Sequence, residues 1–387
     1  MRRGTEAGRE MTSKERMLAA MRNMRPDVVP VSPDISNMIP CRLTGKPFWD
    51  IYYSHDPPLW RAYMDAVRYF RMDGWHIYGP VMMKVRDDQR SLESKIISRD
   101  AERFTVRTTC RTPAGDMWTE TVYCVADPPT VTRRWIKDLK EDLPKIVYMF
   151  PQIDGYDRAP LEEHMDYCGD DAAVGCSVSV PGLHDMHSLF DGGVTAAVYA
   201  MHDYPDEFDE LTAVEQEHYC RQAEMMIDAR PDFLLLGASG LWTMSSPEIF
   251  RKASLPTVQR ITKMCKQAEL PSMLHACGKQ REMVAILVNE TDLDCVNPLE
   301  PPPMGDCELA ELKRTHGDKI ALMGNLHTTD VMLYGSVEDV RAASVDAIDA
   351  AAEGGGFILS TGDQCGRDTP DENIRAMVET ARSYGRY

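Results

Sequence analysis

The sequence contains no long apolar run. No stretch of ~18 uninterrupted apolar residues occurs, and this is about the length that a membrane-spanning helix requires. The first ten residues are polar and lack the apolar segment of a secretory signal. We therefore expect a cytoplasmic protein.

Positive charge is also in deficit. The chain of 387 residues has 43 Lys and Arg against 61 Asp and Glu, which gives a net charge of -18. Such a surface repels phosphate backbones and anionic lipid head groups, so nucleic acids and membranes are poor partners. A small molecule or another protein is the expected ligand.

Three common motifs are missing. The eleven cysteines contain no CxxC pair, and their odd number argues against a complete disulfide framework, so we expect mostly reduced, buried thiols. Neither GxGxxG nor GxxxxGK[ST] is present, which removes the main sequence support for dinucleotide or nucleoside triphosphate binding. The remaining composition, 43% hydrophobic and 27% charged, is typical of a packed globular protein.

Short apolar runs alternate with helical stretches along most of the chain. The runs predict strands at residues 28–33, 75–78, 172–180, 233–237, 272–276, 294–299, 320–324 and 357–360. Strands that alternate with helices pair in parallel, and eight of them close naturally into a (β/α)8 TIM barrel. The fold class is therefore α/β, with an open doubly wound sheet as the alternative.

The domain layout follows from local signals. A capping box from Thr12 to Glu15 indicates that the fold begins near Met11, so residues 1–10 are expected to be a disordered N-terminal tail and residues 11–387 a single barrel domain. Alternating residues around a turn at Pro113 predict an antiparallel β-hairpin inserted at residues 95–125. Ser246 and Thr369, each followed by proline, are predicted N-caps of outer helices.

One imidazole and two thiols follow predicted strands. His275 and Cys277 lie at the end of one strand, and Cys365 follows the last one. Loops at the carboxyl ends of barrel strands face the same rim, so these side chains can converge. One His and two Cys would leave a tetrahedral Zn²⁺ with an open position, as in catalytic zinc sites. The alternative is a rim histidine with two buried structural cysteines.

Several segments resemble the C-terminal half of uroporphyrinogen decarboxylase-like proteins. They are residues 274–279, 297–306 (NPLEPPPMGD), 324–326 and 354–359, and the likeness covers residues 232–387 well. Decarboxylases of this superfamily carry an arginine-rich RQAGRY segment after the first strand, where this chain has Pro33 to Met38 with Asp34. Because that cationic cradle for substrate carboxylates is missing, uroporphyrinogen decarboxylation itself is not expected.

Another branch of the superfamily consists of cobamide-dependent methyltransferases. Their zinc is held by an HxC pair and a distant Cys near the last strand, a pattern that His275, Cys277 and Cys365 match. The resemblance implies zinc-dependent transfer of a methyl group between a small substrate and the cobalt of a corrinoid (cobalamin). Nothing here resembles the DxHxxG cobalamin-binding signature, so the corrinoid is expected on a partner protein. Methoxylated aromatics (O-demethylation), methanol, methylamines and methyl thiols all remain open as substrates.

Further site residues are predicted from their positions after strands. Glu300, Asp363 and His327 are candidates for a general acid near the metal, with Glu300 first; its alternative role is to cap a backbone loop. Candidates for the substrate pocket are Asp34, Asn37, Tyr78, His184 and Trp242. Trp242 and Tyr78 could stack on an aromatic ether, or could simply pack in the core.

Two other functions stay open. A metal-free decarboxylase of the same superfamily predicts no bound zinc. A non-catalytic zinc-binding barrel predicts zinc without methyl transfer to cobalamin.

Overall fold

The computed structural model describes residues 10–387, so the predicted tail at residues 1–10 lies almost entirely outside the described part. Seven parallel strands form the central sheet, in the order β1-β8-β9-β10-β11-β12-β13. Their bounds are β1 Gly74–His76, β8 Ala172–Ser179, β9 Phe233–Gly237, β10 Ser272–His275, β11 Cys295–Asn297, β12 Ala321–Leu326 and β13 Phe357–Thr361. Each coincides with a predicted strand.

The predicted first strand closes the ring as a short bridge. Val31 pairs in parallel with Leu359 of β13, and on its other side its carbonyl accepts a hydrogen bond of 2.9 Å from Asp73 N. Pro30 and Pro33 lack N–H donors, which explains why no longer strand forms here. Val29 N in turn donates to Gly385 O at 2.8 Å, so the far end of the chain pairs with this segment. The predicted (β/α)8 TIM-barrel fold is thus confirmed.

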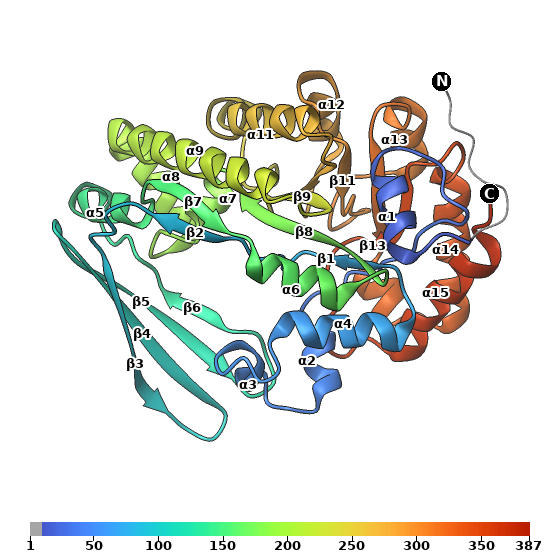
Figure 1. The fold of residues 1–387 in the computed structure, drawn as a ribbon, viewed down its shortest axis with the longest axis horizontal. Helices are drawn as coiled ribbons and strands as arrows, with labels where there is room; N and C mark the ends of the chain where they lie inside the picture. The colour runs from blue at the N-terminus through green and yellow to red at the C-terminus, as the bar shows by residue number, and fades with distance from the viewer. Residues whose placement is uncertain (1–9) are drawn as a thin grey trace.

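Helices surround the ring of strands (Figure 1). Their amphipathic sequences place apolar side chains against the outer face of the sheet, where the largest cluster of buried residues lies. The outer helices are α4 Leu59–Phe70, α6 Ala159–Cys168, α9 Pro205–Asp228, α11 Leu255–Gln267, α12 Arg281–Glu290, α13 Leu309–His316, α14 Val337–Ala351 and α15 Asp371–Tyr384. None of the helices within residues 10–387 is both long and apolar enough to cross a membrane.

Helix α1 (Ser13–Met21) closes the amino end of the ring. Its predicted capping box is present, because Thr12 and Glu15 each accept a hydrogen bond from the other's backbone. Met17 and Met21 pack into the interior of the ring with Trp75, Phe233 and other inward-facing side chains. The opposite, carboxyl ends of the strands carry the polar loops.

The predicted hairpin insertion is part of a larger sheet. Phe104 pairs with Tyr123 and Thr109 with Trp118, as the alternation predicts. Additional strands flank this hairpin on both sides, so the inserted sheet has four antiparallel strands rather than two. They are β3 Ser91–Arg99, β4 Arg103–Thr112, β5 Gly115–Cys124 and β6 Thr130–Arg133. The sheet stands beside the barrel at the lower left of Figure 1.

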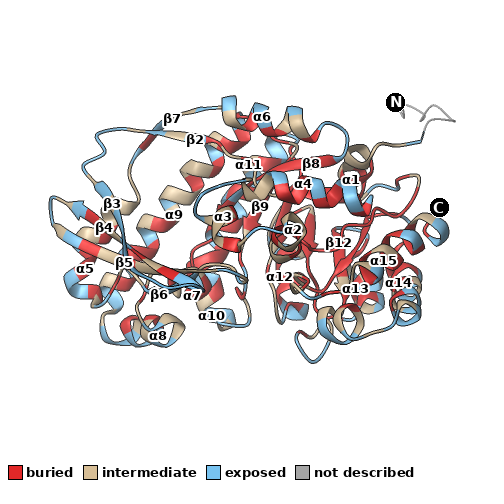
Figure 2. Cartoon of the chain, turned by 90° about the horizontal axis from the view of Figure 1, so that it is seen from below, coloured by how far each residue is buried: buried red, intermediate tan, exposed pale blue. Residues whose placement is uncertain are grey.

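A second apolar cluster anchors this inserted sheet. Cys110 and Met117 pack against helices α5 (Leu139–Ile146), α7 (Leu183–Met186) and α8 (Gly193–Asp203). Figure 2 shows the contrast between the buried barrel strands and the largely exposed insertion. A separate antiparallel pair, β2 (Met82–Val85) with β7 (Ile153–Asp157), connects the insertion to the barrel. The other short elements are α2 Met38–Thr44, α3 Phe48–Tyr52, α10 Pro247–Ile249, a 3-10 turn Val147–Met149, and π-helical turns Phe250–Ser254 and Thr328–Leu333.

The predicted helix starts were correct at Ser246 and wrong at Thr369. The Ser246 side chain accepts a hydrogen bond from Ile249 N and caps the helix. Helix α15 instead begins after Pro370, and the Thr369 hydroxyl is buried without a hydrogen-bond partner. The carbonyl of Thr369 accepts a hydrogen bond from the guanidinium of Arg42 on α2. Thr369 therefore contacts α2 and does not cap α15.

Candidate functional site

Loops after β10, β11 and β13 bring a thiol and two carboxylates together. One ligand atom each from Cys277, Glu300 and Asp363 all lie within 4.8 Å of one another. Among residues 10–387 this is the only such group of three or more His, Cys, Asp or Glu side chains. All three residues were predicted for the site, although Glu300 and Asp363 as acids rather than as metal ligands.

His275 lies beside this group. It ends β10, in register with Asn297 of β11, and its Nε2 is 3.9 Å from Asp363 Oδ1. Its other ring nitrogen, Nδ1, is buried and has no hydrogen-bond partner. A buried imidazole nitrogen without a partner is costly, and a metal ion or a substrate atom would satisfy it.

Cys365, the third predicted ligand, is not part of the group. It is fully buried two residues after Asp363, and its backbone N–H donates to Asp34 O at 2.8 Å. Burial raises the pKa of its thiol to about 12, with the charge of Asp34 adding to the effect. The structure therefore brings Cys277 and His275 to Asp363. Cys365 lies in the same loop as Asp363 but is not part of the group.

The loops that carry these side chains are fixed by local contacts. Gly278, with a φ of 89°, lets its backbone N–H reach the Glu300 carboxylate, and Lys279 N donates to Thr243 Oγ1 at 2.9 Å. Asp363 adopts a φ of 143°, which is rare for a residue with a side chain. Thr361 Oγ1 holds it there by donating to Asp363 O at 2.7 Å. Unusual backbone of this kind is concentrated at functional sites.

Burial raises the pKa of each of the three grouped side chains. It raises the pKa of Cys277 to about 11. It also raises the pKa values of Glu300, where the charge of Asp363 adds to the effect, and of Asp363, where the charge of Asp34 adds. The deprotonated forms of these side chains are therefore unfavourable unless a positive charge lies next to them. The donor set of thiol, imidazole and carboxylates fits a borderline divalent cation such as Zn²⁺, which would favour the deprotonated ligands.

The other predicted acid, His327, caps a turn. Its Nδ1 accepts hydrogen bonds from Thr329 N and Asp330 N at 3.2 and 3.0 Å, so its proton is on Nε2. That Nε2 is buried without a hydrogen-bond partner. Glu300 likewise combines both predicted alternatives, since its carboxylate caps the Gly278 loop and also faces Cys277.

The predicted pocket residues divide into two sets. Asp34 and Tyr78 meet around Ser36, whose N–H donates to Asp34 Oδ1 at 3.0 Å and whose carbonyl accepts from the Tyr78 hydroxyl. Asn37 follows directly, with its Oδ1 buried and unpartnered. These residues are linked to the site because Cys365 N bonds Asp34 O.

His184 and Trp242 have different surroundings. Both ring nitrogens of His184 are buried without a partner, and burial lowers the pKa of this histidine to about 3. Trp242 packs edge-on against Phe250, with ring centroids 5.5 Å apart. Within the described chain, no hydrogen bond, ion pair or ring contact joins either residue to Cys277, Glu300 or Asp363.

Two polar residues near the site were not predicted. Asn297 ends β11 beside His275, and its Oδ1 is buried without a partner. Gln280 is fully buried, with Nε2 bonded to Ala276 O and Oε1 unpartnered. Their position at or just after adjacent strand ends is the signal that could have found them.

The fold and the site define a TIM-barrel-like α/β protein whose chemistry-bearing side chains sit at the carboxyl ends of the strands. The family model described as "Uroporphyrinogen decarboxylase (URO-D)" matches residues 187–384. This is half of the sequence, and the chain belongs to that family. The predicted resemblance to the superfamily and its methyltransferase branch is confirmed.

Relatives include proteins named as methyltransferases and as decarboxylases. Methylcobamide:CoM methyltransferase MtbA of Methanosarcina mazei is 28% identical over 42% of this chain and 45% of its own length. Methylcobamide:CoM methyltransferase MtaA of Methanosarcina barkeri is 28% identical over 46% and 50%. Uroporphyrinogen decarboxylase of Coxiella burnetii is 30% identical over 20% of this chain and 21% of its own length. The chain thus spans about half the length of the methyltransferases it matches.

A solved structure agrees over nearly the whole chain. A methyltransferase from Methanosarcina mazei superposes with a TM-score of 0.65 and 18% identity, covering 97% of this chain and 99% of its own. At this identity the match supports the fold. The family model and the methyltransferase relatives, rather than this match, support an enzyme of the URO-D superfamily.

Proposed function

We propose that this chain is a zinc-dependent methyltransferase that moves a methyl group between a small methylated substrate and the cobalt of a corrinoid protein. The observation that carries the proposal is the meeting of Cys277 with Glu300 and Asp363, beside the unpartnered Nδ1 of His275. The methylcobamide:CoM methyltransferases among its relatives support the same reaction class. A methoxylated aromatic is the substrate that we would test first.

His275, Cys277 and Cys365 would hold the metal, with the carboxylate of Asp363 next to His275 as a competing ligand. When bound, zinc would supply a Lewis acid for the heteroatom of the substrate, and the corrinoid would supply the cobalt that exchanges the methyl group. The corrinoid arrives on a partner protein, and we place both proteins in the cytoplasm.

The remaining site residues would bind the substrate and manage its proton. Glu300 faces Cys277 while its carboxylate is held by Gly278 N–H, so it is positioned to protonate a leaving oxygen. His327 presents a protonated Nε2 as an alternative donor. Asp34, Asn37 and Tyr78 would line the substrate pocket from the first strand segment and β1, and His184 and Trp242 from the loops after β8 and β9.

The first experiment is metal analysis by plasma mass spectrometry. The wild-type chain is measured beside Cys277→Ser, Cys365→Ser and Asp363→Asn. Cys124→Ser is the matched control, because Cys124 is also a partly buried free thiol but lies in the inserted sheet. About one zinc per chain, lost in Cys277→Ser and Cys365→Ser but kept in Asp363→Asn and Cys124→Ser, supports the predicted ligands.

Other results discriminate among the alternatives. Zinc lost with Asp363→Asn but kept with Cys365→Ser would replace Cys365 by the carboxylate in the ligand set. Zinc without methylation of cob(I)alamin by any methyl donor would favour a non-catalytic barrel. The absence of zinc from the wild-type chain would contradict the proposal and favour a metal-free decarboxylase.

A further inference from the structure

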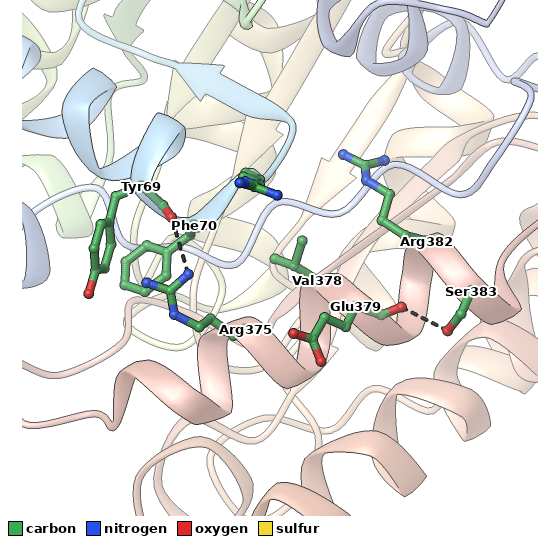
Figure 3. Close-up of a pocket in the computed structure, with 8 residues that line it drawn as sticks. Tyr69, Phe70, Arg375, Val378, Glu379, Arg382 and Ser383 are labelled. Carbon is green, nitrogen blue, oxygen red and sulfur yellow. Dashed lines mark hydrogen bonds between the residues drawn. The ribbon is translucent and has the colours of Figure 1, made fainter.

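A pocket of about 620 Å³ lies between the carboxyl-terminal end of α4 and the side of α15 from Arg375 to Ser383. It lies in the outer layer of helices and shares no residue with the group of Cys277, Glu300 and Asp363. Its walls include Arg71, Arg375 and Arg382. Arg375 lies beside the aromatic rings of Tyr69 and Phe70, and Arg382 lies further along α15 (Figure 3).

Helix geometry explains why two of these arginines share the pocket. Arg375 and Arg382 are seven residues apart on α15, which is two turns, so both side chains leave the same face. Val378 and Glu379 lie between them on that face (Figure 3). Arg71 comes from the other wall, directly after α4.

Two of the three guanidinium groups have no carboxylate partner. Within residues 10–387, neither Arg71 nor Arg375 has a carboxylate oxygen within 4.0 Å of its nitrogens. Arg375 donates one hydrogen bond, of 3.3 Å, to Tyr69 O and stacks on the Tyr69 ring. In a chain with 61 acidic and 43 basic residues, two unpaired arginines in one pocket are unexpected on charge alone.

The third arginine, Arg382, is paired within the protein. Its Nη2 forms an ion pair of 2.9 Å with the buried Asp73, whereas its Nη1 is buried and has no hydrogen-bond partner. The one acidic residue in the lining, Glu379, is turned to Arg341 of α14 at 3.6 Å. The unpaired guanidinium groups of the pocket are therefore those of Arg71 and Arg375, one from each wall.

We propose that this pocket binds a phosphate group, either as inorganic phosphate or at the end of a phosphate monoester. A guanidinium offers up to five N–H donors in a planar fork that matches phosphate oxygens. A dianion would neutralise Arg71 and Arg375 together. The site is independent of the proposed methyl transfer, because it shares no residue with it.

The test is calorimetric titration of the full chain with inorganic phosphate and with a nucleoside 5'-monophosphate, against potassium chloride at equal ionic strength. The variants are Arg375→Gln and Arg71→Asn. Asn tolerates the left-handed backbone of residue 71, where φ is 57°, so this variant should fold normally by circular dichroism. Arg251→Gln, which removes an arginine paired with Glu290 on another helix, is the matched control.

We expect phosphate to bind the wild-type chain and the control equally, and each pocket variant at least roughly tenfold more weakly. Tighter binding of the monophosphate would identify a monoester as the natural ligand, and equal affinities would identify free phosphate. Absence of binding, heats that chloride reproduces, or unchanged affinity in both pocket variants would each overturn the proposal.

Discussion

The carboxylate of Glu300 accepts a hydrogen bond from the backbone N–H of Gly278, the residue directly after Cys277. This bond ties the loop after β11 to the loop after β10. Because Glu300 is only 6% exposed, the bond lies in a poorly solvated place and is stronger than at the surface. One side chain thus holds the Cys277 loop and also faces the site.

Glu300→Gln separates these two roles. The amide oxygen can still accept from Gly278 N, so the variant should fold with nearly wild-type stability, while the acidic proton is lost. We expect methyl transfer from an ether substrate to slow by about 10²-fold. Unchanged turnover would remove Glu300 from the chemistry. Glu300→Ala, which loses the hydrogen bond as well, should in addition lower the free energy of unfolding by about 1–3 kcal/mol.

Gly278→Ala should be much more harmful than the same change at Gly45. A Cβ at position 278 would lie 2.1 Å from Thr243 Oγ1, whereas nothing lies within 4 Å of a Cβ at position 45. Both glycines have positive φ, so both variants carry backbone strain of about 1 kcal/mol. Urea denaturation should show a further loss of about 1–3 kcal/mol for Gly278→Ala. Equal losses would mean that Thr243 moves aside freely.

The buried histidine pair at the edge of the barrel predicts acid sensitivity. His76 Nε2 lies 3.0 Å from His164 Nδ1, and burial lowers the pKa values of His76 to about 3 and of His164 to about 4. Unfolding therefore takes up protons below a pH of about 6.5, the ordinary histidine value, so stability falls as the pH drops from there toward 4.

His164→Gln checks this origin of the acid sensitivity. It removes one of the two titrating groups, so thermal unfolding followed between pH 7 and pH 4 should lose stability less steeply than in the wild-type chain. His202→Gln, at an exposed position, is the control and should follow the wild-type curve. A His164→Gln curve parallel to wild type would assign the acid loss to other groups.

Glu215 on α9 predicts the opposite pH dependence. It is fully buried, both carboxylate oxygens lack a hydrogen-bond partner, and burial together with the charge of Asp185 raises its pKa well above 4.5. The folded chain keeps this proton while the unfolded chain releases it, so the stability contributed by Glu215 declines as the pH rises above about 4.5.

Glu215→Gln should therefore stabilise the chain, and increasingly so as the pH rises from 5 toward neutrality. The gain in unfolding free energy can reach about 1.4 kcal/mol for each pH unit within that range. Chemical denaturation at several pH values measures it, with the exposed Glu224→Gln on the same helix as control. A gain that does not grow with pH would contradict the assignment.

Most of the barrel could be predicted from the sequence because its signals are local. Parallel strands buried on both faces appear as short apolar runs, and this holds even for β11, which has three residues. The outer strands of the insertion gave no such signal. In β3 nearly every side chain is exposed, so its apolar residues Leu92, Ile96 and Ile97 do not alternate with polar ones as in a half-buried strand.

The site was predictable in position but not in side-chain direction. Spacing placed His275, Cys277 and Asp363 at strand ends, and the structure brings these residues together. The orientation of Cys365 depends on the rare backbone of Asp363 and on the hydrogen bond to Asp34, a residue hundreds of positions earlier. Long-range contacts of this kind leave no trace in local spacing, so the metal ligands stay a prediction.

The pairing of Val29 with Gly385 has a consequence for how the protein is made. During synthesis, the segment around Val31 emerges early, but its partner in β13 and the residue that bonds Val29 are translated hundreds of codons later. Until then the ring has two open edges, each with unpaired N–H and C=O groups. The nascent chain therefore passes through a long interval in which these open edges are exposed to pairing with other chains.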